Sequence, residues 1–229
     1  MTQILAIIPA RGGSKRLPGK NIKDLVGKPM ISYTIETAKH CSYIDRVVVS
    51  TDYEEISAVA KNSGAEVIMR PAELATDTAS TNDAINHVLQ TLSEQSYEPE
   101  HIVILQPTSP LRNLEDLTGS IKLYLEKKPT TLVSVCEFEH PVDWAMTMTH
   151  DARVKFSNEA SLAKRSQDQT IFFRPNGAVY LIGRDRFLVK PKFYTDNTIG
   201  YVMPKQRSVD IDDIYDFLIA EAMLKHGEL

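Results

Sequence analysis

Cysteine is scarce in this sequence: only Cys41 and Cys136 occur among its 229 residues. Domains held together by disulfides carry several cysteines at regular spacings, and this chain has no such framework. One cysteine follows an expected helix and the other lies in an expected strand. We therefore interpret both as buried or idle thiols.

The sequence also lacks an excess of positive charge and a long apolar run. Its 26 Lys and Arg against 30 Asp and Glu give a formal net charge of −4, whereas proteins that bind nucleic acid usually show a basic excess. Residues 1–9 have no basic segment ahead of their apolar run, which is too short for a signal peptide or a membrane span. We expect a cytoplasmic protein with an intact N-terminus and with neither a nucleic-acid nor a membrane partner.

Short apolar segments rich in β-branched residues recur along the chain and alternate with helical patterns. Runs of this length are typical of strands buried on both faces of a sheet. They cover 4–8, 46–49, 66–69, 102–105, 132–135, 179–182 and 199–203. Apolar residues at helical spacing mark helices near 30–38, 84–92 and 214–222. The alternation predicts a single α/β domain over residues 1–229, with a Rossmann-like, mostly parallel sheet and helices on both faces.

One long stretch, residues 139–174, breaks this alternation. It has no clear periodicity, contains Trp144 and carries a polar run with Lys164 and Arg165. A segment of this length without regular structure is usually functional in a compact domain, or packs against a partner. We predict that it is an insertion through which the chain forms a homodimer.

A loop rich in glycine and positive charge follows the first predicted strand. Residues 11–20 contain four cations in an otherwise acidic chain, namely Arg11, Lys15, Arg16 and Lys20. Glycines such as Gly12 and Gly13 let backbone amides approach an anion, and the cations supply charge for phosphate. The spacing fits neither a Walker A loop nor the dinucleotide pattern G-x-G-x-x-G. The alternative is a solvated turn with scattered surface charge, but the place after the carboxyl end of a strand favours a phosphate site.

Two further loops follow predicted strands. Residues 70–81 end in hydroxyls at a helix start, where Ser80 or Thr81 could act as the N-cap. Residues 105–112 read Leu-Gln-Pro-Thr-Ser-Pro-Leu-Arg, and the two prolines make this loop rigid enough to position polar side chains. The alternative for the second loop is a structural turn with Arg112 at the surface.

Paired carboxylates appear near the end of the chain, in the run Ser-Val-Asp-Ile-Asp-Asp at residues 208–213. In an extended segment alternate side chains point to one face, so Asp210 and Asp212 can converge while Ile211 points into the core. Two carboxylates beside substrate phosphates suit Mg²⁺. The alternative is helix capping by Asp212 or Asp213, and both can hold if Asp213 is the cap.

These segments resemble the CMP-sialic acid synthetase family, which includes cytidylyltransferases for sialic, legionaminic and pseudaminic acids. The resemblance runs from residue 7 to residue 212 and is weak only over 139–172. It rests on I-P-A-R-x-x-S-K-x-x-x-x-K-N at 8–21, R-P-x-x-L-A-x-D-x-x-S at 70–80, Q-P-T-S-P-L-R at 106–112, R-x-N-G-A-x-Y at 174–180 and S-x-D-I-D at 208–212.

The resemblance implies a role for individual residues. The implied catalytic set is Arg11, Lys20, Asp210 and Asp212, with Mg²⁺ as the cofactor on the two aspartates. The implied nucleotide site consists of Ala10, Arg11, Gly12, Gly13, Lys20, Asn21, Arg70, Ala79 and Ser80, the last three around the cytosine. The implied sugar site consists of Gln106, Arg174, Phe193 and Tyr194, completed across the dimer by Arg165 or its neighbour Lys164. The family has phenylalanine where this chain has Tyr194, so the acyl group of the sugar stays open.

The resulting hypothesis is a cytidylyltransferase that takes CTP and a nine-carbon acidic sugar of the sialic or legionaminic acid type. One alternative is a nucleotidylyltransferase for the eight-carbon sugar Kdo or for another sugar, and residues 106–112 argue against the Kdo type. Another is a non-catalytic nucleotide-binding relative. The catalytic set of Arg11, Lys20, Asp210 and Asp212 argues against that reading because all four are present.

Overall fold

A mixed sheet forms the centre of the computed structural model, which describes residues 2–74, 80–162 and 164–227. Within the described residues this sheet has seven strands. In spatial order they are β11 (Thr198–Val202), β7 (Thr131–Glu137), β10 (Phe173–Gly183), β6 (His101–Ile104), β1 (Ile4–Pro9), β4 (Arg46–Thr51) and β5 (Glu66–Met69). All neighbouring pairs are parallel except those of β10, which runs antiparallel to both β6 and β7. The prediction of a mostly parallel sheet is confirmed.

Helices cover both faces of the sheet, as predicted. Because side chains alternate along a strand, Ile4, Ala6 and Ile8 of β1 join one buried cluster, whereas Leu5 and Ile7 join the other. The first cluster is closed by α1 (Met30–His40), α2 (Glu54–Asn62) and α4 (Leu114–Lys127). The second is closed by α3 (Thr81–Glu94) and α5 (Arg184–Val189).

The carboxyl ends of the parallel strands meet at one edge of the sheet, where a third buried cluster lies. It packs α6 (Ile214–His226) against the loop after β1, against a small hairpin of β2 (Asp24–Leu25) and β3 (Lys28–Pro29), and against Leu111 and Ile211. Short 3-10 turns shape the connections at Lys20–Ile22, Ala72–Leu74 and Lys205–Arg207. The predicted phosphate loop and residues 208–213, called the carboxylate segment below, therefore share one packed core.

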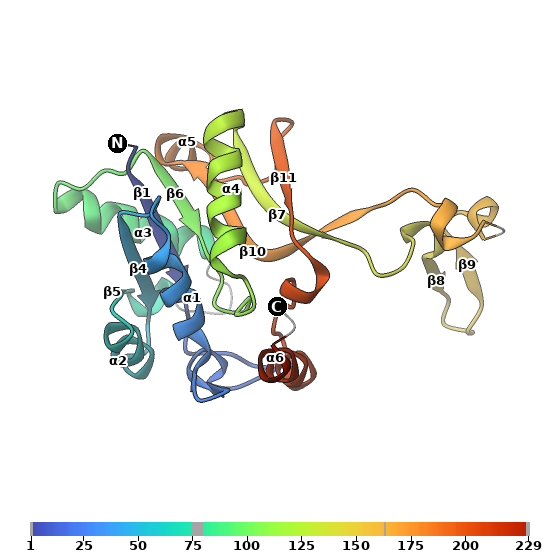
Figure 1. Cartoon of the computed structure of the whole chain (residues 1–229), viewed down its shortest axis with the longest axis horizontal. Coiled ribbons are helices and arrows are strands. Elements are labelled where there is room, and N and C mark those ends of the chain that lie inside the picture. Colours follow the sequence, from blue (N-terminus) through green and yellow to red (C-terminus); the bar gives the residue numbers. More distant parts are fainter. Residues whose placement is uncertain (1, 75–79, 163, 228–229) are drawn as a thin grey trace.

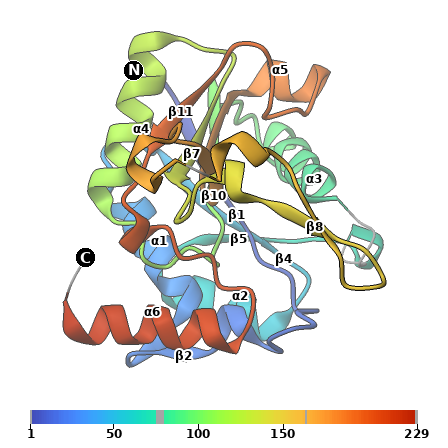
Figure 2. The ribbon, with the colours of Figure 1, turned by 90° about the vertical axis from the view of Figure 1, so that its right-hand side faces the viewer.

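An insertion between β7 and β10, residues 138–172, extends away from the sheet (Figure 1). It holds the hairpin of β8 (Met146–Met148) and β9 (Val154–Phe156), with 3-10 turns at Val142–Trp144, Glu159–Ser161 and Ser166–Asp168. Figure 2, in which the insertion points toward the viewer, shows α6 along one edge of the molecule below it. The predicted range 139–174 is corrected at its end, because Phe173 and Arg174 pair with β7 as the start of β10.

None of the helices in the described part of the chain is both long and apolar enough to cross a membrane.

Candidate active site

A cleft of about 570 Å³ opens at the carboxyl edge of the parallel strands. The loops after β1, β5 and β6, the start of α3 and the carboxylate segment form its wall. The lining residues are Pro9, Arg11, Ser14, Lys15, Arg16, Leu17, Lys20, Asn21, Arg70, Leu74, Ser80, Thr81, Gln106, Pro107, Thr108 and Asp212. The structure thus brings together seven of the predicted site residues: Arg11, Lys20, Asn21, Arg70, Ser80, Gln106 and Asp212.

The loop after β1 is held by side chains rather than by regular structure. Buried Asn21 donates a hydrogen bond from Nδ2 to the carbonyl of Arg11 at 3.0 Å. The N–H of Gly12 donates to Oδ1 of Asp52 at 3.1 Å, so this amide already has an acceptor. A methyl group on Gly12 would lie 2.9 Å from Cγ of Tyr53, which explains the glycine by close approach. Ala10 is buried behind the loop and, like Gly12 and Gly13, does not line the cleft.

Two cations of this loop contact the carboxylate segment. Nζ of Lys20 donates to the carbonyl of Ile211 at 2.7 Å and lies 3.6 Å from Oδ1 of Asp212. Nη2 of Arg16 lies 3.0 Å from Oδ2 of Asp212. The positive and negative groups predicted from opposite ends of the chain are therefore in direct contact.

The carboxylate segment is not one of the strands of the structure, but burial alternates over residues 210–212 as the sequence predicts. Ile211 is fully buried, while Asp210 and Asp212 are both partly exposed on the other side. Burial raises the pKa of Asp210, a hydrogen bond from Thr108 lowers it, and the charge of Asp212 raises it again. Asp213 caps α6 by accepting from the N–H groups of Tyr215 and Asp216 at 2.8 and 3.2 Å. Capping thus falls to Asp213, which leaves Asp210 and Asp212 to other uses.

The loop of residues 105–112 contacts the carboxylate segment and a bulge in β10. The carbonyl of Thr108 accepts from the N–H of Ile211 at 2.8 Å. Gly177 has a positive φ of 76° in the bulge, and a methyl group there would lie 2.9 Å from Oε1 of Gln106 and 3.2 Å from Oδ2 of Asp210. The predicted sugar contact and the predicted metal ligand therefore meet at Gly177.

Buried polar side chains next to the site join its segments by hydrogen bonds. Arg112 is 2% exposed, donates from Nη1 to the carbonyl of Ala178 at 2.7 Å, and has its pKa lowered to about 10 by burial. The surface position for Arg112 is therefore wrong. Asn176 accepts a hydrogen bond from Oγ of Ser134 at 2.6 Å and donates one to Oγ of Ser208 at 2.9 Å. These bonds join β7, β10 and the carboxylate segment.

Of the residues predicted to surround the cytosine, Arg70 and Ser80 line the cleft. Nη2 of Arg70 donates to the carbonyl of Ser50 at 2.6 Å. Burial lowers the pKa of Arg70, Asp52 raises it, and Arg11 lowers it. Ser80 is the N-cap of α3 and forms a capping box with Asp83, as one of the two predicted alternatives has it. Ala79 lies outside the described residues.

The remaining sugar candidates lie beside the cleft or far from it. Phe193 packs against Tyr180 and Phe187 with ring centroids 5.3 and 5.9 Å apart, as a core aromatic does. Tyr194 is exposed and lies near Tyr180, whose pKa is raised first by burial and then by Tyr194 and Asp210. Arg174, on β10, does not line the cleft.

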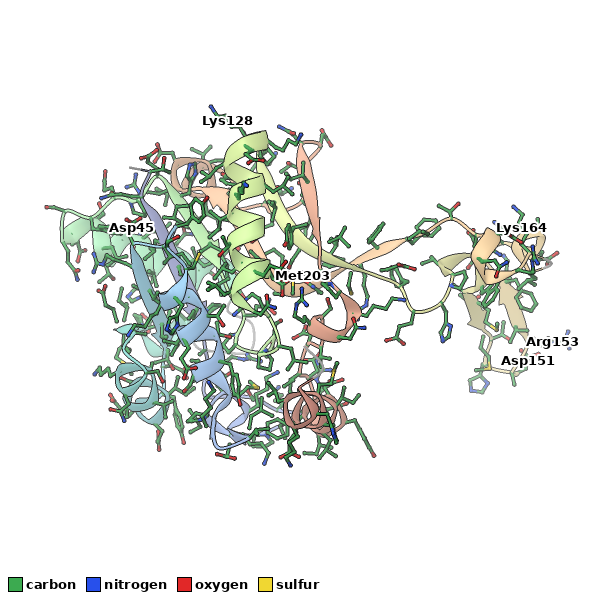
Figure 3. All side chains as sticks on the ribbon, viewed as in Figure 1. Asp45, Lys128, Asp151, Arg153, Lys164 and Met203 are labelled. Atoms are coloured by element: carbon green, nitrogen blue, oxygen red, sulfur yellow. The ribbon has the colours of Figure 1, made fainter. Side chains whose placement is uncertain are left out.

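The basic pair of the insertion does not reach the cleft of its own chain. Lys164 lies in the distal part of the insertion, as does the pair Asp151 and Arg153 (Figure 3). The neighbouring Arg165 is exposed and forms an ion pair with Asp168 at 3.0 Å. A contact of these residues with a sugar would require a second subunit.

The donor set at the cleft fits a cation shared with a substrate. Among the described residues no group of three or more His, Cys, Asp or Glu side chains could hold a metal. Asp212 lines the cleft, whereas Asp210 does not line it but lies near enough to Asp212 to feel its charge. Mg²⁺ commonly binds to one or two carboxylates and completes its shell with substrate phosphates and water. The residues present therefore suit Mg²⁺ that arrives with a nucleotide.

Three contributors to the site were missed from the sequence. Thr108 lowers the pKa of Asp210 by hydrogen bonding, and Asp52 accepts a hydrogen bond from Gly12 of the phosphate loop. Gly177, which has no side chain, allows Gln106 and Asp210 to approach its backbone closely. Thr108 and Gly177 lie inside motifs that had been recognised, so their motifs carried a signal. Asp52 directly follows β4 and lies three residues after the run predicted at 46–49, and that position at the carboxyl edge was the only hint.

Comparisons with known proteins agree with this geometry. The sequence profile of a family described as "Cytidylyltransferase" matches residues 5–217. The N-acylneuraminate cytidylyltransferase of Escherichia coli O18:K1:H7 is 36% identical over 96% of this chain, which spans 51% of that relative. The pseudaminic acid cytidylyltransferase of Campylobacter jejuni is 35% identical over 96% of both chains. The CMP-N,N'-diacetyllegionaminic acid synthase of Legionella pneumophila is 31% identical over 97% of both chains.

A solved structure has the same fold. The CMP:2-keto-3-deoxy-manno-octonic acid synthetase complexed with CTP matches with a TM-score of 0.73, covering 100% of each chain. At 20% sequence identity the match concerns the fold and not the substrate.

Proposed function

The chain belongs to the cytidylyltransferase family, and from that membership we propose that it transfers CMP from CTP to a nine-carbon 2-keto acidic sugar and releases pyrophosphate. The observation that carries this proposal is the cleft in which the cationic loop, Asp212 and Gln106 converge, with Asp210 close to Gln106 at Gly177. The names of the 31–36% identical relatives support the sugar class.

In the proposed reaction the anomeric hydroxyl oxygen of the sugar attacks the α-phosphorus of CTP. The bond from that phosphorus to the bridging oxygen breaks, pyrophosphate leaves opposite the attacking oxygen, and the hydroxyl proton is released to the medium. Positioning and charge stabilisation supply most of the catalysis in phosphoryl-type transfers. Arg11 and Lys20 would balance the phosphate charge, while Gln106 would orient the sugar beside them.

We assign the metal site to Asp210 and Asp212. The two carboxylates are near enough for the charge of Asp212 to raise the pKa of Asp210, and Lys20 and Arg16 already balance Asp212. Mg²⁺ bound there would supply positive charge to the phosphates of CTP. The chain's own part is to hold the two carboxylates at fixed places, through Thr108 and the Asp213 cap.

The base pocket is assigned to the region around Arg70 and Ser80, which line the same cleft as Arg11. We expect this pocket to be of pyrimidine size, so that ATP and GTP are used far less well than CTP. UTP is the harder nucleotide to reject, because only hydrogen bonds at the base edge distinguish it from CTP.

Because the reaction uses CTP, we also propose that it takes place in the cytoplasm.

Pyrophosphate release with CTP tests this function against its alternatives. The acceptors are a sialic, a legionaminic and a pseudaminic acid, with Kdo as the eight-carbon comparison. We expect turnover with at least one nine-carbon sugar, and the sialic or legionaminic type is favoured by residues 106–112. Turnover with Kdo alone would assign the chain to the rival sugar class. CTP binding without turnover on any acceptor would favour a non-catalytic nucleotide-binding protein.

We further propose that the protein is a homodimer formed through the insertion of residues 138–172. This insertion exposes apolar side chains that its own domain does not cover, namely Met146, Met148, Val154 and Ile171. Helix α6 exposes a second apolar stripe of Ile214, Tyr215, Leu218 and Ile219. Surfaces of this kind are typical of subunit interfaces.

A dimer would also let Arg165 or Lys164 of one subunit face the sugar in the other. Light scattering should show twice the chain mass. Mixing Arg165→Ala subunits with Asp210→Ala subunits should restore part of the activity, because one of the two mixed sites would be intact. A fully active monomer would contradict the dimer, and a dimer without complementation would contradict the shared site only.

A further inference from the structure

A single peptide group in the phosphate loop, the one that joins Arg11 to Gly12, is held from both sides. Its carbonyl accepts from Nδ2 of Asn21 at 3.0 Å, and its N–H donates to Oδ1 of Asp52 at 3.1 Å. Because a peptide group is planar, fixing its oxygen and its N–H fixes the orientation of the whole plane. That orientation sets the direction in which the Arg11 side chain leaves the backbone.

The segment that carries Asp52 is packed closely against the same loop. The carbonyl of Ser50 accepts from the N–H of Ala10 at 2.9 Å, which extends the pairing of β1 with β4 up to the loop. The ring of Tyr53 lies against Gly12, so a side chain at position 12 would collide with it. Residues 50–53 therefore act as a rigid wall on which the turn at Arg11 rests.

The charge of Asp52 has two opposing effects on a nucleotide. It attracts Arg70, which Arg11 repels, and so it helps to keep two guanidinium groups near each other. The same negative charge would repel a triphosphate in the cleft. The hydrogen bond to Gly12 acts in a third way, because it orients the peptide group that follows Arg11.

We propose that Asp52 is a positioning residue of the triphosphate site, which aims Arg11 by holding the Arg11–Gly12 peptide against the pull of Asn21. This inference rests on the proposed function. Asp52 lies behind the loop and is not among the residues that line the cleft, so it acts through Gly12 and not on the substrate.

Three substitutions separate the hydrogen bond from the charge. Asp52→Ala removes both, Asp52→Asn keeps an acceptor oxygen at the same place, and Asp52→Glu keeps the charge but displaces the carboxylate by one methylene group. We expect Asp52→Ala and Asp52→Glu to raise the KM for CTP about ten-fold, the loss of one charge-assisted hydrogen bond. Asp52→Asn should stay within about three-fold of the wild type. The KM for the sugar should change little in all three.

A matched control lies at the other end of the same pair of strands. Oδ2 of Asp45 accepts from the N–H of Ile4 at 2.6 Å, where β4 begins and away from the cleft (Figure 3). Asp45→Ala removes a similar long-range bond to β1 and should lower the melting temperature without changing the KM for CTP. The calorimetric Kd of CTP is measured for every variant.

Each outcome decides the matter. An unchanged KM and Kd for CTP in Asp52→Ala, beside a wild type that binds CTP, would overturn the positioning role alone. Tighter CTP binding in both Asp52→Ala and Asp52→Asn would show that the residue acts as a repulsive charge. If Asp52→Ala does not fold, a normal KM in Asp52→Glu overturns the proposal. A wild type that binds no CTP would remove the proposed function, and this inference with it.

Discussion

At the scale of single residues, Asp210 and Asp212 have different surroundings although both lie on the carboxylate segment. Asp212 is balanced by Arg16 and Lys20. Asp210 is more buried, and its pKa is raised first by that burial and further by Asp212. A carboxyl whose pKa is higher in the folded than in the unfolded protein destabilises the fold once the pH rises above its folded pKa. The ionised side chain of Asp210 therefore costs stability at neutral pH.

We predict that Asp210→Asn abolishes most turnover and raises the melting temperature of the protein at pH 7 without nucleotide or divalent cation. The amide keeps the shape of the side chain and removes the buried charge. Asp212→Asn should also abolish most turnover but should not raise the melting temperature, because it leaves Arg16 and Lys20 without their carboxylate. Activity assays and thermal unfolding of both variants check this. Near-normal Mg²⁺-dependent turnover in both would remove the metal assignment.

The position of Gly177 allows a second residue-scale test. Gly177→Ala forces an L side chain to a φ of 76° and pushes a methyl group toward Gln106 and Asp210. We expect a loss of about 1–2 kcal/mol in the free energy of unfolding and a fall of roughly 100-fold in kcat/KM, as for other small displacements of reacting groups. Steady-state kinetics and denaturant unfolding measure the two effects.

The control for that variant is Gly27→Ala in the β2–β3 hairpin. Gly27 has a φ of 86°, and a methyl group there has no neighbour within 4 Å. It should therefore cost a similar amount of stability and leave activity unchanged. Equal activity losses in the two variants would mean that the crowding at Gln106 and Asp210 has no part in catalysis.

At the scale of elements, the positions of all seven strands follow from their apolar runs, and α1, α3 and α6 follow from helical spacing. Helices α2, α4 and α5 were missed. The buried face of α4 mixes Leu117, Ile121 and Tyr124 with the polar residues Asp116 and Ser120, which obscures the apolar spacing, although its capping box of Asn113 and Asp116 is visible in the sequence. The antiparallel direction of β10 could not be predicted, because it depends on the path of the chain through the insertion and not on local pattern.

One ion pair joins α4 to the 3-10 turn Lys205–Arg207, which directly precedes the carboxylate segment. Arg207 contacts Asp116 through Nε at 2.7 Å and Nη2 at 2.9 Å, and the Asp116 side chain is only 1% exposed. We predict that Arg207→Ala lowers the free energy of unfolding by about 3–5 kcal/mol, since it leaves a buried carboxylate unpaired. Adding Asp116→Asn should recover a large part of this loss, because the amide removes the charge. Denaturant unfolding of the single and double variants gives both values.

The matched control for the ion pair is Arg184→Ala. Arg184 is as buried as Arg207, but its partner Glu98 is 55% exposed and stays solvated when the arginine is removed. The expected loss is about 1 kcal/mol or less. A loss in Arg207→Ala no larger than in this control would show that the pair does not hold the carboxylate segment in place.

At the scale of the whole molecule, the site is assembled from parts of the chain that are far apart in sequence. The hydrogen bond from Lys20 to the carbonyl of Ile211 joins residues 191 positions apart. Motifs predicted which residues matter, and the carboxyl edge of a parallel sheet predicted that their loops gather. The sequence could not predict which atoms meet, such as Asp52 with the Gly12 amide, because those contacts are set by strand order and packing. The place of Lys164 and Arg165 in an assembly stays a prediction.

The most direct test of the central claim follows the phosphorus atoms of CTP. The protein is incubated with Mg²⁺, a nine-carbon acceptor sugar, and CTP labelled either at the α- or at the γ-phosphorus. Cytidylyl transfer predicts that the α-label appears in the sugar product and the γ-label in pyrophosphate, with neither transfer in a variant that carries both Asp210→Asn and Asp212→Asn. A γ-label found on the sugar or in inorganic phosphate, with no α-label on the sugar, would contradict the account.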